Sequence, residues 1–458
     1  MSDGLAQPQR ALAFLTILIA VSMSVIDSSV VNIALPTISD DLAVAPERAI
    51  WVINAYNLAI TVSLLPLASL GDIVSYRTVY RAGIVLFTLA SVVCGFSQSL
   101  GVLTMARVVQ GLGAAGVMSV NIALIRAIYP SSILGVGVSN LAFVVAVGSA
   151  ASPTVGAAIL AVAPWRWLFF INAPLGLIAI ALAFRVLPAT PRHDLKLDAV
   201  SVALNVATFS LLVFGVDALG AHNLQPAALE LGGFVVMGAL LTWRQFGLAL
   251  PVLPIDLLRL PVFALSMVAS ISSFAAQSLT MISLPFYFIN ELKLPVATAG
   301  LMMTPFPLGI ALMAPIAGRL ADRYTPGLLG SAGLIVFCAG LLAAAFMPAS
   351  PSTFDIAWRL AVCGMGFGFF QSPNNKAIIS SAPENRSGGA AGLQSTGRLV
   401  GQTLGAAAMA VIFARQASHP IAFGLTLAAA FTIVGAIASG FRRAAPRPAA
   451  RSAQVNTN

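Results

Sequence analysis

The run ALAFLTILIAVSMSVIDSSVVNIAL occupies residues 11–35 and contains one charged residue, Asp27. It is long enough to cross a bilayer as a helix, which takes about 20 apolar residues. It is also too long for the apolar region of a cleaved signal peptide, so it predicts a retained membrane helix. That helix would hold a carboxylic acid within the hydrocarbon.

The composition extends this prediction to the whole chain. Of 458 residues, 59% are hydrophobic and 9% are charged, whereas soluble chains carry roughly 25% charged residues. We therefore predict an all-α membrane protein, without a separate soluble domain and with about 14 transmembrane helices, an even number that places both termini on one side. The predicted spans are 12–35, 50–70, 79–98, 102–124, 134–160, 167–187, 199–219, 228–248, 262–289, 298–318, 328–347, 355–378, 389–414 and 420–441.

The net charge of +9 is better explained by membrane topology than by nucleic-acid binding. With the termini inside, the inner segments hold most of the basic residues. The outer loops and helix ends hold only Arg48, Arg166, Lys293 and Arg415. We thus expect a multi-pass protein of the cell membrane with both termini in the cytoplasm and no nucleic-acid partner.

A weak internal repeat divides the chain. Leu70-Gly71-Asp72 with Arg77 follows the second span, and Gly318-Arg319-Leu320-Ala321-Asp322-Arg323 follows the tenth. The copies are 322 − 72 = 250 residues and eight spans apart, so two spans are additional to two six-helix halves. The predicted parts are a half at 1–190, two additional peripheral helices at 191–255, a half at 256–441, and a disordered cytoplasmic tail at 442–458.

Four stretches carry a resemblance to a known family. They are Asp27 to Pro36 in the first span; Arg107-Val108-Val109-Gln110-Gly111-Leu112-Gly113 in the fourth; Gly148, Pro153 and Gly156 in the fifth, with Trp165 to Pro174 after it; and Ser372-Pro373-Asn374-Asn375 with Gly401-Gln402. Together they resemble the fourteen-helix drug:proton antiporter branch of the major facilitator superfamily. The resemblance implies a secondary transporter that couples drug efflux to proton entry.

Asp27 is the strongest candidate for proton coupling. An acid within a membrane span is costly, so it rarely lies there without a role. Arg107 and Gln110 share a helix face, and the resemblance associates this arginine with proton coupling. Counting 1.5 Å per residue puts Asp27 and Arg107 at one depth, where opposite charges would pair directly or through water. A purely structural role for these polar residues, in holding helices together, is the alternative.

Other residues are candidates for packing, for the substrate cavity and for gating. Gly111 and Gly113 favour close helix packing, and Gly148, Pro153 and Gly156 predict a bent, closely packed helix that the resemblance associates with antiport. Asp27 is the only deep acid, which favours lipophilic monocations or neutral compounds as substrates. The cavity candidates are Asn32, Asn54, Tyr56, Asn57, Gln277, Asn374 and Asn375, and the gating candidates are Asp72, Arg77, Asp322 and Arg323.

Several other functions are disfavoured. The lysines, Lys196, Lys293 and Lys376, are not preceded by glycine, so there is no P-loop for an ATP-driven pump. We expect no enzyme activity, no cofactor and no metal. The expected partners are a small-molecule substrate, protons and the lipid bilayer, and the expected state is a monomer. A dedicated metabolite exporter or importer of the same fold remains the nearest alternative, followed by a passive facilitator. The roles of Arg359 and Arg398 stay open.

Overall fold

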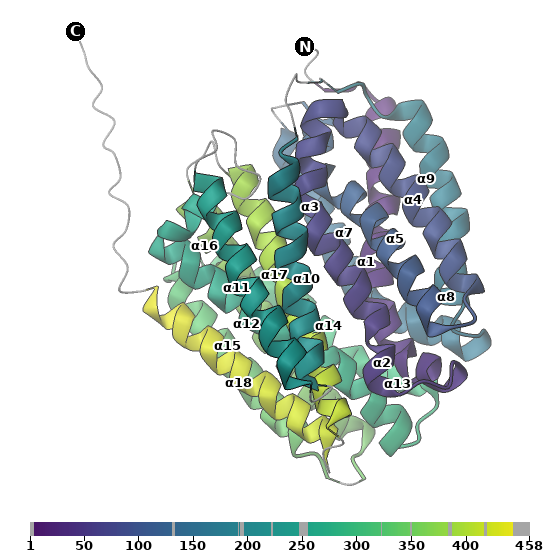
Figure 1. Cartoon of the computed structure of the whole chain (residues 1–458), viewed down its shortest axis with the longest axis vertical. Coiled ribbons are helices and arrows are strands. Elements are labelled where there is room, and N and C mark those ends of the chain that lie inside the picture. Colours follow the sequence, from purple (N-terminus) through teal and green to yellow (C-terminus); the bar gives the residue numbers. More distant parts are fainter. Residues whose placement is uncertain are drawn as a thin grey trace.

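The computed structural model describes residues 4–130, 133–190, 192, 197–220, 223–246, 255–321, 323–348, 350–382, 387–415 and 419–442. Within these ranges the regular structure is entirely helical (Figure 1). Twelve helices or helix pairs are long and apolar enough to cross a membrane. The 29-residue helices α7 and α16 bring the number of crossings to fourteen, which confirms the predicted fold class.

The first six crossings form one bundle. They are α1 (Gln9–Asp41), α2 and α3 (Pro46–Ala49, Trp51–Val74), α4 (Tyr76–Phe96), α5 and α6 (Leu100–Ser119, Asn121–Ile128), α7 (Leu134–Val162), and α8 and α9 (Trp167–Phe170, Asn172–Val186). Two further crossings follow, α10 (Ala199–Gly220) and α11 (Leu224–Phe246).

The last six crossings form the second bundle. After η2 (Ile255–Arg259) come α12 with η3 (Pro261–Phe286, Tyr287–Glu291), α13 and α14 (Val296–Met303, Pro305–Leu320), α15 (Pro326–Ala345), α16 (Thr353–Ser381), α17 (Ser387–Ala414) and α18 (Pro420–Phe441). Proline begins α12, α14, α15 and α18, because the first turn of a helix does not need its missing N–H. Ser99 and Ser352 cap α5 and α16 with their side chains.

Glycines let neighbouring helices approach at backbone distance. A Cβ on Gly113 of α5 would lie 2.4 Å from the Phe87 nitrogen of α4. A Cβ on Gly366 of α16 would lie 2.3 Å from the Phe337 nitrogen of α15. Neither position has space for a larger side chain, so these contacts fix the α4–α5 and α15–α16 pairs.

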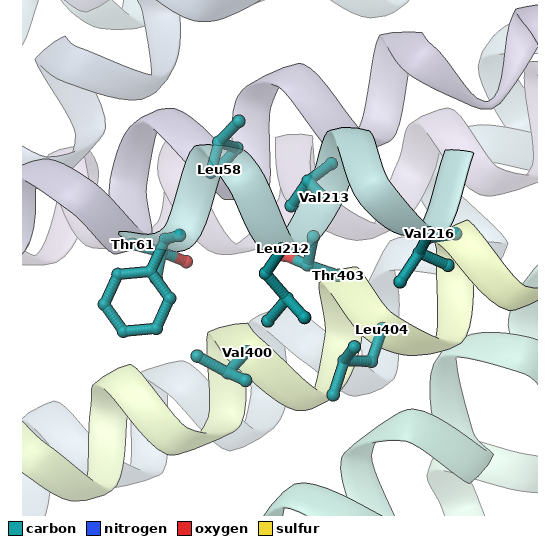
Figure 2. Close-up of a pocket in the computed structure, with 10 residues that line it drawn as sticks. Leu58, Thr61, Leu212, Val213, Val216, Val400, Thr403 and Leu404 are labelled. Carbon is teal, nitrogen blue, oxygen red and sulfur yellow. The ribbon is translucent and has the colours of Figure 1, made fainter. Parts of the chain in front are cut away.

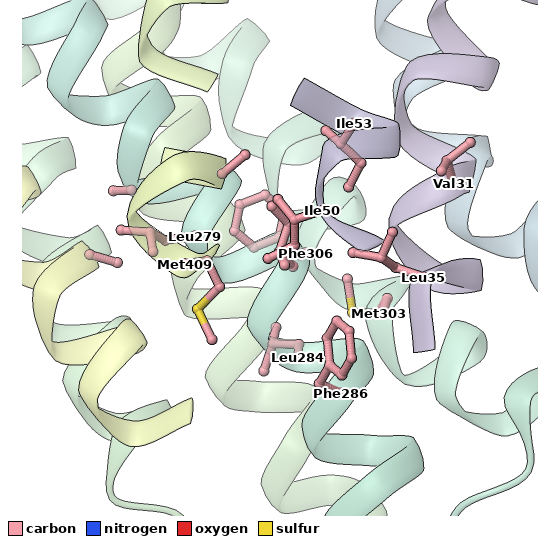
Figure 3. Packing of buried hydrophobic residues seen from close by; sticks show 14 of the residues in the cluster. Val31, Leu35, Ile50, Ile53, Leu279, Leu284, Phe286, Met303, Phe306 and Met409 are labelled. Carbon is pink, nitrogen blue, oxygen red and sulfur yellow. The ribbon is translucent and has the colours of Figure 1, made fainter. Parts of the chain in front are cut away.

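One apolar cluster crosses from the first bundle to the second. Val31 and Leu35 of α1 belong to the same buried cluster as Met303 and Phe306 (Figure 3). Close by, α7 packs on α13, where a Cβ on Gly300 would lie 2.4 Å from the Ala157 Cβ. These contacts hold the two halves together near the C-terminal end of α1, at the end of the molecule opposite to the one where α1 begins.

The two additional helices are the least buried of the candidate spans in the described chain, in keeping with a peripheral position. Helix α10 packs against both α3 and α17, one helix from each half, whereas α11 packs mainly on α10. Asn205 of α10 donates to the Val62 oxygen of α3 at 2.8 Å, and the Trp51 indole donates to Asp217 at 3.0 Å. A small apolar pocket lies where the three helices meet, between side chains such as Leu212 and Leu404 (Figure 2).

Arg442 differs from its predicted place in a disordered tail. Its side chain is 7% exposed and donates to Asn374 Oδ1 and Ser266 Oγ at 2.8 and 2.9 Å. It therefore pins the end of α18 to α16 and α12. Residues 443–458, the rest of the predicted tail, lie outside the described residues. The predicted boundaries after 190 and 255 fall beside segments that are also largely outside them.

Candidate functional site

Asp27 lies at the centre of a polar cluster within the first bundle. Arg107 Nη1 of α5 forms an ion pair with Asp27 Oδ2. Gln110 Nε2 and Asn172 Nδ2 donate to Asp27 Oδ1 at 2.9 and 3.0 Å. None of the four residues is more than 4% exposed. The carboxylate is thus paired, hydrogen-bonded and closed off from solvent, and this pairing offsets the cost of burying its charge.

The guanidinium of Arg107 is held in place by three further contacts. Its Nε donates to the Val52 oxygen of α3 at 3.0 Å, and Nη1 donates to Gln110 Oε1 at 2.7 Å. The Tyr56 ring lies beneath it, 3.9 Å from the guanidinium carbon, which adds a cation–π attraction. Arg107 is therefore tied to α3 and α5, and the pair separates only if α1 and these helices move relative to one another.

Helix α4 completes the cluster. Gln110 Nε2 donates to Ser91 Oγ at 2.8 Å, and Cys94 Sγ approaches Gln110 Oε1 at 3.6 Å. Gly111 allows the whole arrangement, because a Cβ there would lie 2.7 Å from the Tyr56 oxygen. The close approach of α5 to α3 brings Arg107 within reach of both Val52 and Tyr56.

The predicted proximity of Asp27 and Arg107 is present as a direct contact, and Gln110 joins it. Their roles in proton coupling stay predictions. The sequence analysis did not propose a role for Asn172, although the residue lies in the third quoted stretch, between Trp165 and Pro174. An uncharged amide in an apolar run indicates a functional site less strongly than a charged side chain does.

The cavity candidates do not form one group. Asn54, Tyr56 and Asn57 are buried in α3, and Tyr56 packs on Arg107. Asn374 is buried and accepts from Arg442. Asn32, Gln277 and Asn375 are partly exposed, and Asn375 accepts from Gln394 of α17. A substrate cavity with all seven residues stays a prediction.

Two of the four gating candidates, Asp72 and Arg77, make hydrogen bonds in the first bundle. Asp72 accepts from the Tyr76 hydroxyl, and Arg77 approaches the Leu187 oxygen at 3.5 Å, so both are tied to the first bundle. Arg323 is exposed, and Asp322 lies outside the described residues.

Helix α7 continues through Pro153, and its glycines face α1. A Cβ on Gly148 would touch Val25 at 3.4 Å, and one on Gly156 would clash with Val30 at 2.6 Å. This is the close packing that the sequence predicted, whereas the association of this helix with antiport stays a prediction.

The two arginines whose roles were open, Arg359 and Arg398, have different surroundings in the structure. Arg359 Nη1 forms an ion pair with Asp355 at 2.8 Å near the start of α16. Arg398, in the middle of α17, has no hydrogen bond or ion pair with any of the residues that the structure describes. The expected substrate class, lipophilic monocations or neutral compounds, stays a prediction. In this structure Arg107, Gln110 and Asn172 occupy the Asp27 carboxylate.

Two helical bundles, the first of which encloses a buried ion pair, with fourteen membrane crossings in the described chain, are the architecture of a secondary transporter. The chain belongs to the Major Facilitator Superfamily, whose model matches residues 17–406 and 266–457. It is 48% identical over 453 residues to the uncharacterized transporter YebQ of Escherichia coli K12, which covers 97% of this chain and 98% of that protein.

Two further relatives differ in what their names say they carry. The riboflavin transporter RibZ of Clostridioides difficile is 28% identical, over 90% of each chain. The multidrug resistance protein Stp of Mycobacterium tuberculosis is 29% identical, over 86% of this chain and 74% of its own length. The family and the transporter class are therefore confirmed, and the relatives span more than one kind of substrate.

Proposed function

We propose that this chain exports small lipophilic molecules, drugs among them, from the cytoplasm in exchange for protons. The observation that carries the proposal is the enclosed Asp27 carboxylate with its Arg107 partner. A carboxylate that is paired in one conformation and freed in another can release and take up a proton as the protein cycles. The multidrug relative Stp supports efflux of drugs, and RibZ supports a dedicated metabolite as the second candidate.

The energy source is tested with dyes of different charge. Cells that express the chain are loaded with ethidium, Nile red or fluorescein, and efflux is followed before and after addition of a proton uncoupler with ATP kept high. We expect efflux of at least one dye to stop when the proton gradient collapses. Continued efflux excludes proton antiport, net accumulation identifies an importer, and equilibration without concentration identifies a passive facilitator.

The Arg107 partner provides a second test of the same proposal. Arg107→Ala removes the positive charge that neutralises the Asp27 carboxylate in this structure. The pH dependence of transport should therefore move upward. An unchanged pH profile would show that the pair does not control the coupling proton.

A further inference from the structure

Arg398 is a cation inside the membrane-spanning helix α17 that makes no hydrogen bond or ion pair with the described part of the chain. It lies about 17 Å from the start of α17 and about 24 Å from its end, at 1.5 Å per residue. Its side chain is partly exposed and has no hydrogen bond or ion pair with any residue in the described ranges. Arg359, also on a helix of the second bundle, has its own carboxylate in Asp355. An unpaired charge at this depth is costly and therefore indicates a functional site.

The packing of α17 shows where Arg398 points. Val400, Thr403 and Leu404 meet α10 around the apolar pocket (Figure 2). Their spacing along the helix places them on the side of α17 opposite to Arg398. Leu399 packs in a cluster with Tyr56 of α3, and a Cβ on Gly401 would lie 2.4 Å from the Ile271 oxygen of α12. Arg398 thus projects between α3 and α12, one helix from each half, into the interface where alternating access takes place.

Amide side chains flank the guanidinium on the same helix face. Gln394 and Gln402 are one turn before and one turn after Arg398, and side chains four residues apart are neighbours. Gln394 donates to Asn375 of α16. The face therefore offers one fixed positive charge among neutral hydrogen-bonding groups, with the apolar Leu399 beside it.

The charge balance selects the solute. Asp27 is neutralised by Arg107 inside the first bundle, so it cannot compensate Arg398 in this conformation. We propose that Arg398 binds the negatively charged group of the transported solute, an organic monoanion such as a carboxylate on an apolar body. A guanidinium presents a planar fork that matches a carboxylate. This inference rests on the proposed transport function and replaces a cationic or neutral substrate class with an anionic one.

Equilibrium binding without any gradient tests the substrate class. Purified full-length protein in lipid nanodiscs is titrated with naphthylacetate, naphthylacetamide and naphthylmethylammonium, which share one ring system and differ in charge. We expect the carboxylate to bind about tenfold or more tightly than the other two, the size of one charge-assisted hydrogen bond. Equal or tighter binding of the ammonium compound, or no carboxylate binding at millimolar concentration, overturns the proposal.

Variants then assign the preference to Arg398. Arg398→Gln should lose the carboxylate preference and keep amide binding, which also shows that the variant is folded. Arg398→Lys, which keeps the charge, should retain a smaller preference. Arg359→Gln is the matched control, because that arginine already has a carboxylate partner, and it should leave the preference unchanged. A preference that survives Arg398→Gln overturns the assignment.

The two proposals fail separately. If the carboxylate preference is present but an uncoupler does not affect transport, proton antiport is wrong and the anion site stands. If transport follows the proton gradient but the binding preference is absent or reversed, the anion site is wrong and proton antiport stands.

Discussion

The two halves repeat the same backbone contacts around different chemistry. Gly83, Phe87 and Gly113 of the first half correspond to Gly333, Phe337 and Gly366 of the second, 250 to 253 residues later, and make equivalent close approaches. At the same offsets, Asp27, Arg107 and Gln110 correspond to Gln277, Leu360 and Cys363. Leu360 and Cys363 are fully buried in the apolar cluster.

This difference shows how a duplicated scaffold can divide its tasks. The glycine contacts set the helix geometry in both halves, and geometry alone does not require a charge at the centre. The first half holds a closed and balanced ion pair, while the second half has an apolar centre and presents Arg398 at the interface. We infer that proton coupling belongs to the first half and solute recognition largely to the second.

The largest effect is expected at Asp27. Asp27→Asn should reduce uphill transport to the passive level, because the amide cannot carry a proton, while the protein remains folded in the membrane. Gln277→Leu at the corresponding position should change substrate affinity and leave gradient-driven transport in place. Uptake against a gradient in proteoliposomes measures both. If Asp27→Asn still concentrates solute, Asp27 is not the coupling group.

The next effect concerns stability. Arg107→Ala leaves a buried carboxylate without its cation, which should lower the free energy of unfolding by about 3–5 kcal/mol. The double variant Asp27→Asn with Arg107→Ala should recover part of this loss, because no charge is then left unpaired. Denaturant unfolding in detergent micelles gives the double-mutant cycle. A fully additive loss would mean that the two side chains do not interact energetically.

Because the two halves share the same glycine packing, we expect an equal loss of stability in both halves, smaller than the loss from Arg107→Ala. Gly113→Ala and Gly366→Ala should each lower stability by about 1–3 kcal/mol, because the new Cβ meets backbone atoms. Gly101→Ala is the matched control, since nothing lies within 4 Å of its position, and it should not destabilise the fold. Thermal unfolding of the three variants measures this. A large loss in only one half would break the structural equivalence.

The smallest effect is expected outside both halves. Asp198 accepts from Arg244 Nη2 at 2.8 Å and joins the start of α10 to the end of α11. The pKa of the Asp198 carboxyl lies below its usual range, and the main cause is the hydrogen bond from Arg244. A lowered pKa contributes stability that is present above the ordinary value near 3.8 and is lost as the pH falls through the folded-state value. Asp198→Asn should therefore lower the melting temperature only slightly at neutral pH, because surface pairs contribute little. A large drop would show that the hairpin depends on this pair.

The sequence was sufficient to predict the membrane crossings and the charged residues inside them, because both depend on the free-energy cost of exposing apolar groups or burying charged ones. Long apolar runs define the crossings, and a charged residue inside such a run is easily recognised. Asp27 and Arg107 could therefore be identified from the sequence, and their similar predicted depth in the membrane indicated that they pair. Gly111 and Gly113 could be recognised as packing residues, because small residues let membrane helices approach closely. The structure places Gly111 against α3 and Gly113 against α4.

Other features depend on how the helices are rotated and placed, which a single sequence does not specify. The direction of Arg398 follows from the contacts of α17 with α3, α10 and α12. Asn172 reaches Asp27 only because α9 packs beside α1. The burial of Arg442 likewise requires Ser266 and Asn374 to converge on it from two other helices.

The position of α10 has a consequence for molecules dissolved in the lipid. A transporter of two helical halves has two lines along its sides where the halves meet and the bilayer borders both. Along one of them, α10 lies against α3 and α17 and its side chains close the gap with apolar contacts. Along the other, α7 meets α13 and α14 without an additional helix in the described chain. In the described chain the additional helix thus covers only one of the two lines, so we expect a hydrophobic solute that enters from the lipid to approach along the other, beside α7 and α14.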